Sequence, residues 1–406
     1  MRVALSTNIL APYRVPVFRE LAATPGWQLR VFTNAESEFD RAWRSEAGAL
    51  DVQRVASLSL PQRFGRGSAA AQTTTLHLPL GLFSALLRFA PDAIVSGELG
   101  PRSCIAAAAS AALGVPLVLW AYPSRASAAA AGRVRQRLRR ALLRRASAVI
   151  GMGQQAREAL RALGADDARI FDAPNAHDAD GIARALAGRE PGALRAALRA
   201  RCGARERIAL VAGRLVPVKG IRELLRAWSA QPPELRAGWS LLFVGDGPEA
   251  LRVADASVLA QPGEILRLEG AAFDAMPAIY AACDLLVFPT FGDTWGLVVN
   301  EAMACGLPVL CSRLAGACDE LVSEGSGGNG FCTDPREPSE LARALREALG
   351  APDLRARGAR SRERIASFGP ARMAEDMRRA IRSTLAPEAL PSAPPAPRLA
   401  RSDTPS

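Results

Sequence analysis

The chain has 406 residues, of which 49% are hydrophobic and 22% are charged. This length is sufficient for two domains of ordinary size, each with its own core. The sequence contains no run of 18 or more uninterrupted apolar residues, which argues against a membrane-spanning helix. Its first residues, MRVALSTN, lack the features of a signal peptide, so we expect a cytoplasmic protein.

The formal net charge of +11 belongs almost entirely to the first half of the chain. Residues 1–175 contain 22 arginines and 12 acidic residues, a balance of +10. Such a basic half suits an anionic partner. Nucleic acid is not the expected partner, because only the charge suggests it and the three tyrosines offer little aromatic interleaving.

The seven cysteines form no CxxC pair, and five of them lie between Cys283 and Cys332. Most of these five fall in apolar runs, which indicates small core residues in a reducing compartment. Neither of the two histidines lies near the group, so a zinc site is not expected.

In chain order, short β-branched segments alternate with helical segments rich in Ala, Leu and Arg, a rhythm typical of βαβ units and parallel sheets. Helices are predicted between most strands of the first half, for example over Arg14–Ala23 and Ile105–Leu113. The strands predicted there are Arg2–Thr7, Gln28–Thr33, Ala93–Ser96, Leu117–Ala121, Ala148–Met152 and Arg169–Asp172.

The segment APNAHDADG at 173–181 interrupts this alternation, and 182–206 is predicted to be a connecting segment with a helix. After Pro338 the chain is predicted to be helical to about Leu385, before a tail rich in Pro, Ser and Ala. Between these regions the predicted strands are Ile208–Ala212, Ser240–Val244, Ile265–Leu268, Leu285–Phe288 and Pro308–Cys311.

These elements predict an α/β fold with two tandem doubly wound, Rossmann-like domains. Ligands in such sheets bind beyond the carboxyl ends of the strands, so a cleft between the domains is the expected site. The predicted divisions are an N-terminal domain at 1–180, a connecting segment at 181–206, a C-terminal domain at 207–368, a helix at 369–386 that packs back on the N-terminal domain, and a disordered tail at 387–406.

The segment VAGRLVPVKG (211–220) ends one of these strands and places Arg214 and Lys219 before a helix. Two cations at the carboxyl end of a strand suit a diphosphate, because arginine binds two oxygens and lysine acts as a point charge. The alternative is a pair of solvated surface cations. Lys219 is the only lysine among the 51 basic residues of the chain, which favours a functional role.

A second strand–turn–helix segment, FVGDGPE (243–249), contains Gly245 and Gly247. Glycines at such positions permit a close approach of the backbone to a ligand. The signal is weak alone, because tight turns between a strand and a helix often have this composition.

The segment GDTWGLVVNEAMACGLP (292–308) carries two acids in an otherwise apolar helix, which is predicted to begin near Trp295. The free N–H groups of its first turn favour an anion such as phosphate. Asp293 precedes the helix, and Glu301 lies roughly 9–10 Å beyond its start at about 1.5 Å per residue. Two acids so placed suit the two ends of one polyhydroxylated ligand. The alternatives are an N-cap for Asp293 and an ion pair with an arginine for Glu301.

Together with GRLVPVKG, VGDGP, YAACDLLVFPT and GGNGF, this segment resembles glycosyltransferase family 4, whose members are retaining enzymes of the GT-B fold. The resemblance covers about residues 1–385, and the order of the motifs makes it specific. The segments TNILAPYRVPVF and RIFDAPNAHD also resemble members that act in bacterial surface-polysaccharide assembly.

The resemblance implies that the C-terminal domain binds a nucleoside-diphosphate sugar. Glu301 would hold the ribose hydroxyls, and Asp293 would contact the hydroxyls of the donor sugar. Arg214 and Lys219 would bind the diphosphate, and the backbone N–H groups around Trp295–Val298 would face the sugar and phosphate. The implied catalytic residues are Arg214, Lys219 and Asp293, and the implied donor-binding residues are Arg214, Lys219, Gly245, Asp293, Thr294, Trp295, Gly296, Leu297, Val298 and Glu301.

The chain also departs from the family pattern. Asp293 stands where the family usually has Glu, one methylene longer, and Val218 stands where Glu is frequent. The first loop, STNILAPYR, lacks paired glycines, and LWAYPS at 119–124 lacks a histidine that is often found there. In the N-terminal, acceptor-side domain, the residues that could face the acceptor instead are Tyr13, Arg14 and Tyr122.

The implied reaction moves a hexose-type sugar from a nucleoside diphosphate to an acceptor hydroxyl with retention, without a metal ion or a separate cofactor. Oxygens of the leaving phosphate help to deprotonate the acceptor, so no protein nucleophile is needed, and two cations stabilise the diphosphate. One alternative is a non-catalytic nucleotide-sugar-binding subunit of an assembly complex, against which the set Arg214, Lys219 and Glu301 argues. Another is an epimerase, which needs acid–base groups that the sequence does not show.

The segment GRVRQRLRRALLRRA (132–146) contains seven arginines, and no acid occurs over residues 99–157. Val134, Leu138 and Leu142 recur every four residues, which predicts one apolar helix face between basic ones. The alternative is a core-facing helix with a solvated basic surface. The basic N-terminal half favours docking on the anionic inner face of a membrane, where a lipid-linked or saccharide acceptor would be reached.

Overall fold

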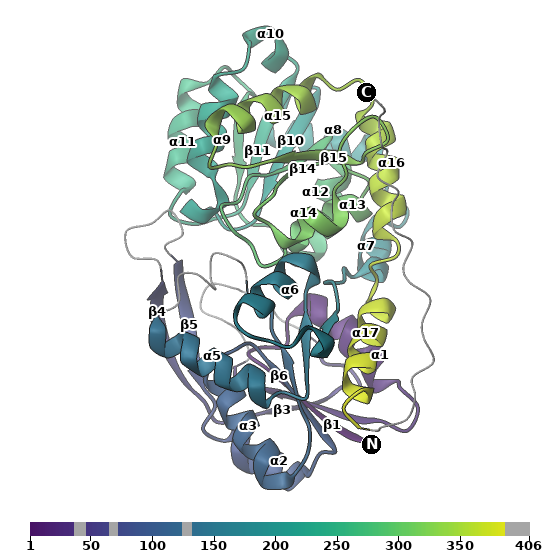
Figure 1. Cartoon of the computed structure of the whole chain (residues 1–406). Helices are drawn as coiled ribbons and strands as arrows, with labels where there is room; N and C mark the ends of the chain where they lie inside the picture. The colour runs from purple at the N-terminus through teal and green to yellow at the C-terminus, as the bar shows by residue number, and fades with distance from the viewer. Residues whose placement is uncertain (36–45, 65–71, 124–131, 386–406) are drawn as a thin grey trace, which may run out of the picture.

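The structure is a computed structural model, which describes residues 1–35, 46–64, 72–123 and 132–385. It contains two parallel sheets, one of seven strands and one of six, and a two-stranded antiparallel hairpin. Each parallel sheet lies at the centre of its own domain, one above the other in Figure 1. The α/β class predicted from the sequence is confirmed, while the tail predicted to be disordered lies outside the described residues.

The N-terminal sheet has the strand order β3-β2-β1-β6-β7-β8-β9. At its centre, Leu5 of β1 lies opposite Val31 of β2 and Val95 of β6, and all three side chains are buried. The strands of this domain are β1 Arg2–Thr7, β2 Gln28–Thr33, β3 Asp51–Arg54, β6 Ala93–Gly97, β7 Leu117–Trp120, β8 Ala148–Gly151 and β9 Ile170–Asp172, and the hairpin consists of β4 Leu58–Phe64 and β5 Gln72–Leu78.

Helices cover both faces of this sheet, as a buried parallel sheet requires. Successive strand residues point to opposite layers, so Leu5 packs in the core that includes α1 and the last helix, α17 (Pro370–Arg382), whereas Ala4 packs in the core that includes α2, α3 and α5. The helices of the N-terminal half are α1 Val15–Ala22, α2 Leu82–Phe89, α3 Pro101–Leu113, α5 Arg133–Arg145 and α6 Gly153–Ala162. In chain order, α7 Ala179–Leu186 and α8 Pro191–Cys202 follow β9 and precede the first strand of the C-terminal sheet.

The C-terminal sheet has the strand order β12-β11-β10-β13-β14-β15. Leu210 of β10 lies opposite Leu242 of β11 and Leu286 of β13, so the segments that follow β10 and β13 are neighbours in space. The strands are β10 Arg207–Ala212, β11 Trp239–Val244, β12 Ile265–Leu268, β13 Leu285–Phe288, β14 Val309–Ser312 and β15 Gly330–Thr333. The helices are α9 Ile221–Ser229, α10 Pro233–Arg236, α11 Ala250–Leu259, α12 Met276–Ala282, α13 Leu297–Ala304, α14 Gly316–Leu321, α15 Pro338–Gly350 and α16 Leu354–Ile365.

The carboxyl edges of the two sheets face each other. Gln155, which follows β8, donates from Nε2 to the carbonyl oxygen of Arg313, which follows β14, at 3.0 Å. Asn300 of α13 donates to the carbonyl oxygen of Asn175, which follows β9, at 2.8 Å. The loops at the carboxyl ends of both sets of strands therefore meet between the domains, where ligands of such sheets bind.

The last helix, α17 (Pro370–Arg382), returns from the C-terminal half to the N-terminal domain and lies beside α1 (Figure 1). Nη1 of Arg378 donates to the carbonyl oxygen of Glu20 at 3.0 Å and to Oγ1 of Thr24 at 3.2 Å. In the part of the chain that the structure describes, no helix has the length and apolar character needed to cross a membrane.

Candidate functional site

The loops that follow β10 and β13 are joined at the centre of the C-terminal sheet edge. The N–H of Phe291 donates to the carbonyl oxygen of Val218 at 2.7 Å. Gly220 has a φ of +70°, and a Cβ at this position would lie 2.2 Å from the carbonyl oxygen of Pro289. Because only glycine fits this close approach, the turn fixes Lys219, the residue before it, against the second loop.

Lys219 and Asp293 form an ion pair between these two loops. Nζ of Lys219 lies 2.7 Å from Oδ2 of Asp293 and 4.7 Å from the ring centroid of Phe288. Burial acts to raise the pKa of Asp293, but the charge and hydrogen bond of Lys219 outweigh it and hold this pKa below its usual value, with a further contribution from Arg214. Asp293 is therefore ionised at neutral pH, and Arg214 belongs to the same electrostatic site.

The side chain of Asp293 does not cap helix α13. Its Oδ1 accepts the N–H of Trp295 at 3.1 Å, whereas α13 begins at Leu297 with Gly296 as its N-cap residue. The helix start predicted near Trp295 is therefore wrong by two residues, because Gly296 takes a φ of +97° that breaks the helix. The N–H of Trp295 donates to Asp293 in this structure, so a contact of that N–H with a ligand stays a prediction.

Binding of an anion at the first turn of α13 stays a prediction. Leu297 and Val298 are half-buried, and the N–H groups of a first helical turn have no partner within the helix. Thr294, just before this turn, is exposed. The indole of Trp295 is buried instead and donates from Nε1 to Oδ1 of Asn300 at 2.7 Å, so this side chain supports the contact between the domains.

Glu301 lies on the same helix and pairs with a tyrosine, not with the arginine considered from the sequence. The hydroxyl of Tyr280 on α12 donates to Oε2 of Glu301 at 2.9 Å. Burial raises the pKa of Glu301 to about 7, although the bond from Tyr280 opposes this shift. Burial also raises the pKa of Tyr280, so its hydroxyl remains protonated and the second carboxylate oxygen can accept other hydroxyl groups.

Gly245, a sequence-derived candidate for donor contact, has a structural reason to be glycine. Its φ is +149°, and a Cβ there would lie 1.9 Å from the carbonyl oxygen of Gly213 in the loop after β10. Its N–H donates to the carbonyl oxygen of Leu268 at 3.1 Å. The close backbone approach expected toward a ligand is thus an approach between two loops, and a donor contact of Gly245 stays a prediction.

The three acceptor-side candidates converge at the facing edge of the N-terminal sheet. Arg14 donates from Nη1 to Oγ1 of Thr7 and from Nη2 to the hydroxyl of Tyr122, both at 2.8 Å. Its guanidinium carbon lies 4.5 Å from the ring centroid of Trp120 and 5.6 Å from that of Tyr13. Since the partners are hydroxyls and aromatic rings, the positive charge of this cluster is not neutralised by them.

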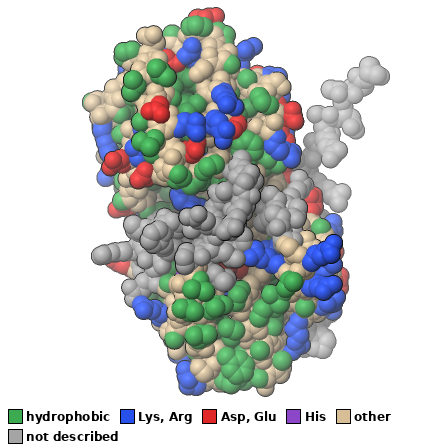
Figure 2. All heavy atoms as spheres, turned by 90° about the vertical axis from the view of Figure 1, so that its left-hand side faces the viewer, with side chains coloured by type: hydrophobic (Ala, Val, Ile, Leu, Met, Phe, Trp, Pro, Cys, Tyr) green, Lys and Arg blue, Asp and Glu red, His purple; other side chains and the backbone are tan. Residues whose placement is uncertain are grey.

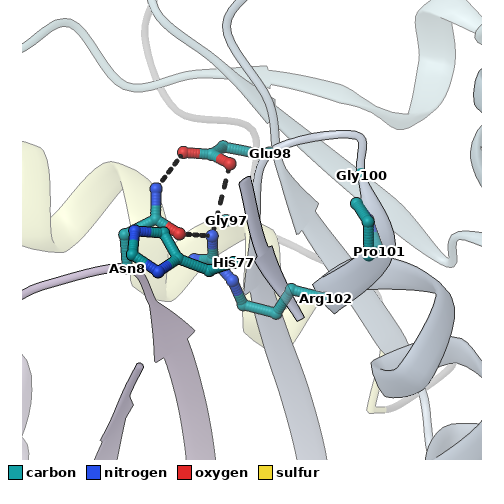
Figure 3. A pocket seen from close by; sticks show the side chains of 7 residues that line it. All are labelled: Asn8, His77, Gly97, Glu98, Gly100, Pro101 and Arg102. Atoms are coloured by element: carbon teal, nitrogen blue, oxygen red, sulfur yellow. Dashed lines mark hydrogen bonds and ion pairs between the residues drawn. The ribbon is translucent and has the colours of Figure 1, made fainter. Parts of the chain in front are cut away.

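A polar pocket of about 40 Å³ lies at the same edge, after β1 and β6 (Figure 3). Glu98 accepts from Nδ2 of Asn8 at 2.8 Å and from Nη2 of Arg102 at 3.2 Å, and Arg102 also donates to Asn8. Glu98 has a φ of +70°, which is costly for a residue other than glycine and is frequent at functional sites. This group was not predicted from the sequence, although the segment GELGPR (97–102) directly follows the predicted strand Ala93–Ser96 and contains both Glu98 and Arg102.

Five of the seven cysteines are buried, as the apolar runs around them indicated. Sγ of Cys318 lies 3.4 Å from Sγ of Cys332 in the core of the C-terminal domain. Within the described ranges, no three His, Cys, Asp or Glu side chains gather closely enough to hold a metal ion.

Two family models match the chain, one in each domain. The model of the glycosyl transferase 4-like domain matches residues 11–176, and that of the glycosyl transferases group 1 matches residues 206–351. The first range contains the acceptor-side candidates, and the second contains every donor-side candidate from Arg214 to Glu301.

Curated relatives match over parts of their sequences. D-inositol 3-phosphate glycosyltransferase of Kineococcus radiotolerans is 32% identical over 231 residues, which cover 52% of this chain and 51% of that protein. O-antigen chain mannosyltransferase B of Escherichia coli is 32% identical over 148 residues, which cover 35% of this chain and 36% of that protein. The chain thus spans about half the length, or less, of the curated relatives that it matches.

The fold matches solved structures over nearly the whole chain. The structure of Anabaena Alr3699/HepE in complex with UDP gives a TM-score of 0.71, with 21% sequence identity, and the match covers 94% of this chain and 100% of that chain. This likeness shows a shared two-domain fold. With both domains matched by glycosyltransferase models, the chain belongs to the group 1, or family 4, glycosyltransferases of the GT-B fold.

Proposed function

We propose that the chain transfers a sugar from a nucleoside diphosphate to an acceptor hydroxyl with retention of the anomeric configuration. The observation that carries the proposal is the Lys219–Asp293 pair beside Arg214, separated by the first turn of α13 from the Tyr280–Glu301 pair. The Asp293 carboxylate, the two cations with the N–H groups of the first turn of α13, and the Glu301 carboxylate follow one another along this edge. That order suits the sugar, diphosphate and ribose of one nucleotide sugar.

The two cations give the site its charge chemistry. Lys219 and Arg214 neutralise the diphosphate, and their charge matters most when the bond to the sugar breaks and negative charge grows on the leaving phosphate. Because the turn at Gly220 holds Lys219 in place, little reorganisation is needed at that moment. An oxygen of the leaving phosphate takes the proton of the acceptor hydroxyl on the same face of the sugar, which agrees with retention.

The two carboxylates bind hydroxyl groups at opposite ends of the donor. Glu301 accepts the ribose hydroxyls, and Tyr280 orients its carboxylate. Asp293 accepts hydroxyls of the sugar while Lys219 keeps it ionised. Solved structures of the similar protein Alr3699/HepE are complexes with UDP or UDP-glucose, which supports a nucleotide sugar as the donor.

The acceptor enters from the N-terminal domain in this proposal. Arg14, Tyr13 and Tyr122 lie at the sheet edge that faces the donor loops, and Glu98 lies in the neighbouring pocket. Burial raises the pKa of Tyr122 although Arg14 opposes the shift, and the negative charge of Glu98 raises this pKa further. Tyr122 and Glu98 therefore share one electrostatic environment. Relatives named for an O-antigen chain and for a lipopolysaccharide outer core support an acceptor in cell-surface polysaccharide or glycolipid assembly.

The N-terminal domain also presents a surface suited to an anionic membrane. On α5, Val134 is 81% exposed and Leu138 is 40% exposed, whereas Leu142 is buried in the core. Leu80, just before α2, and Phe83, in its first turn, are exposed as well. In the view of Figure 2, hydrophobic side chains gather on the N-terminal domain, with basic side chains beside them. Apolar side chains among arginines fit the headgroup region of an anionic bilayer, so we place the protein in the cytoplasm at the inner membrane face.

Incubation with UDP- and GDP-sugars tests the proposal. The full chain is mixed with each sugar nucleotide, with and without bacterial lipids, and released nucleotide and glycosylated product are measured by mass spectrometry. We expect release that depends on an acceptor, and an anomeric configuration in the product, read by NMR, that equals that of the donor. Binding of a sugar nucleotide without any transfer would indicate a non-catalytic subunit, and an inverted product would contradict retention.

A further inference from the structure

The first residues of helix α14 form backbone hydrogen bonds with the loop that contains Asp293. The N–H of Gly316 donates to the carbonyl oxygen of Asp293 at 3.2 Å, and the N–H of Ala317 donates to that of Trp295 at 2.9 Å. Directly before the helix, Ala315 pairs with Asp293 in a parallel β-bridge. The beginning of α14 therefore fixes the backbone of the loop that presents the Asp293 carboxylate.

Gln155 of α6 binds this same segment from the other domain. Its Nε2 lies 3.0 Å from the carbonyl oxygen of Arg313, 3.1 Å from that of Ala315 and 3.1 Å from Oδ2 of Asp319. The side chain of Gln155 is only 4% exposed. Loss of this donor removes the hydrogen bond to the carbonyl oxygen of Arg313 and to Oδ2 of Asp319, whereas the carbonyl oxygen of Ala315 keeps its bond from the N–H of Cys318 at 3.0 Å. An acceptor left unpaired in a buried position costs more than the hydrogen bond itself contributes.

A second hydrogen bond beside Gln155 also runs from a donor in the N-terminal domain to an acceptor in the C-terminal domain. Oε1 of Glu320 on α14 accepts the N–H of Gln154 in the first turn of α6 at 2.8 Å. The N-cap residue of α6, Met152, provides no side-chain cap, so Glu320 caps this helix from the other domain. Gly153 makes the approach possible, because a Cβ there would lie 2.7 Å from the same carboxylate oxygen.

We propose that Gln155 is a positioning residue that holds the Asp293 loop in its sugar-binding arrangement when the two domains are in contact. The inference rests on the function proposed above for Asp293. Gln155 does not touch Asp293; it acts through Ala315, the bridge partner of that residue. Separation of α6 from α14 breaks these buried bonds and releases the segment, and binding of the sugar must favour the contact by the same free energy.

The parts of the site that bind the nucleotide lie outside this connection. Lys219 is fixed by the turn after β10, and Glu301 is fixed by Tyr280 of α12. Gln155 contacts neither of these elements through its side chain. Loss of Gln155 should therefore weaken recognition of the sugar and leave binding of the free diphosphate nearly unchanged.

The experiment compares Gln155→Ala with Gln154→Ala in the full chain. Gln154 is the matched control, because its side chain is exposed and donates to Glu158 of its own helix at 2.9 Å. UDP, GDP and a panel of UDP- and GDP-sugars are titrated calorimetrically, and the best-binding diphosphate and sugar nucleotide of the wild type serve for all variants. For Gln155→Ala we expect a loss of about tenfold in affinity for the sugar nucleotide and less than about twofold for the diphosphate.

A wild-type ratio of the two affinities in Gln155→Ala, or an equal loss for both ligands, overturns the inference. The same change in Gln154→Ala also overturns it. Should Gln155→Ala not fold, Glu320→Gln and Glu320→Ala provide the second comparison: Gln keeps an oxygen that accepts the N–H of Gln154 and should retain the wild-type ratio, whereas Ala should lower affinity for the sugar nucleotide selectively. If the wild type binds no nucleotide at all, the proposed function itself fails, which is a separate result.

Discussion

The ammonium group of Lys219 lies 2.7 Å from a carboxylate oxygen of Asp293, although 74 positions separate the two residues in the chain. Each side chain neutralises the other, so neither charge is buried without a partner before a donor binds. When the donor binds, phosphate oxygens can accept hydrogen bonds from Lys219 while hydroxyl groups of the sugar donate to Asp293. The pair thus places the cation proposed to bind the diphosphate directly beside the carboxylate proposed to bind the sugar.

Lys219→Ala should lower kcat by roughly 10²–10³, because a preorganised donor to the leaving diphosphate is lost. Steady-state nucleotide release from the preferred sugar nucleotide provides the measurement, with folding verified by circular dichroism. In this variant the pKa of Asp293 should also rise, because the charge and hydrogen bond of Lys219 are what outweigh burial and keep this pKa low.

Arg226→Ala is the control for this variant, because Arg226 is an exposed cation on α9, directly after the same turn. We expect it to retain wild-type turnover. Wild-type turnover of Lys219→Ala, or an equal loss in both variants, would contradict the role of Lys219.

Binding of a sugar nucleotide should strengthen as the pH rises from 6 to 8. Burial raises the pKa of Glu301 to about 7, and ribose hydroxyls donate to the ionised form, so binding releases a proton in this range. Below the pKa, affinity should change by up to about tenfold per pH unit. Calorimetric titration in buffers of different ionisation enthalpy measures both the affinity and the proton release.

The stability of the folded chain should change with pH in the opposite direction to the affinity for the sugar nucleotide. A carboxylate whose pKa is raised by folding contributes stability below its unfolded pKa, and this contribution is lost as the pH rises through about 7. Glu301→Gln should therefore unfold with less dependence on pH between 5 and 8 than the wild type. The same variant should lose the pH dependence of sugar-nucleotide binding, and a retained dependence would assign the titration to another group.

Arg137, Arg140 and Arg144 should contribute to membrane binding, at about 1 kcal/mol each near anionic lipid. Sedimentation with vesicles that contain anionic lipid should show binding that weakens with added salt and falls when all three become Gln. Equal binding to neutral vesicles, or no binding to anionic ones, would leave α5 as a purely structural helix.

The sequence was sufficient for the strands with continuous apolar runs. Leu285–Phe288 was predicted with the bounds that the structure shows, because a buried parallel strand is apolar on both faces. Ile265–Leu268 also has its predicted bounds, although it contains Arg267 and is only partly buried at the edge of the sheet. Strands β3 and β15 and the β4–β5 hairpin were not predicted. Strand β3 is the polar segment DVQR, β15 begins with glycine in GFCT, and the hairpin contains the polar run QTTT, so none of them has a continuous apolar pattern.

The site was predictable in its residues but not in its pairings. The motifs and their order brought attention to Lys219, Asp293 and Glu301, yet their partners depend on which strands lie side by side. Asp293 meets Lys219 because β13 lies next to β10, with β11 and β12 on the far side, an order that local patterns do not specify. The Tyr280–Glu301 bond likewise depends on the packing of α12 against α13.

Calorimetric titration of Glu301→Gln and Asp293→Asn tests the central claim most directly, because the two acids are assigned to opposite ends of one donor. Each variant is titrated with the free nucleoside diphosphate and with the sugar nucleotide, beside the wild type. We expect Glu301→Gln to lower the affinity for both ligands, since both carry the ribose. We expect Asp293→Asn to lower the affinity for the sugar nucleotide far more than the affinity for the free diphosphate. The same pattern in the two variants would contradict the proposed arrangement of the donor along α13.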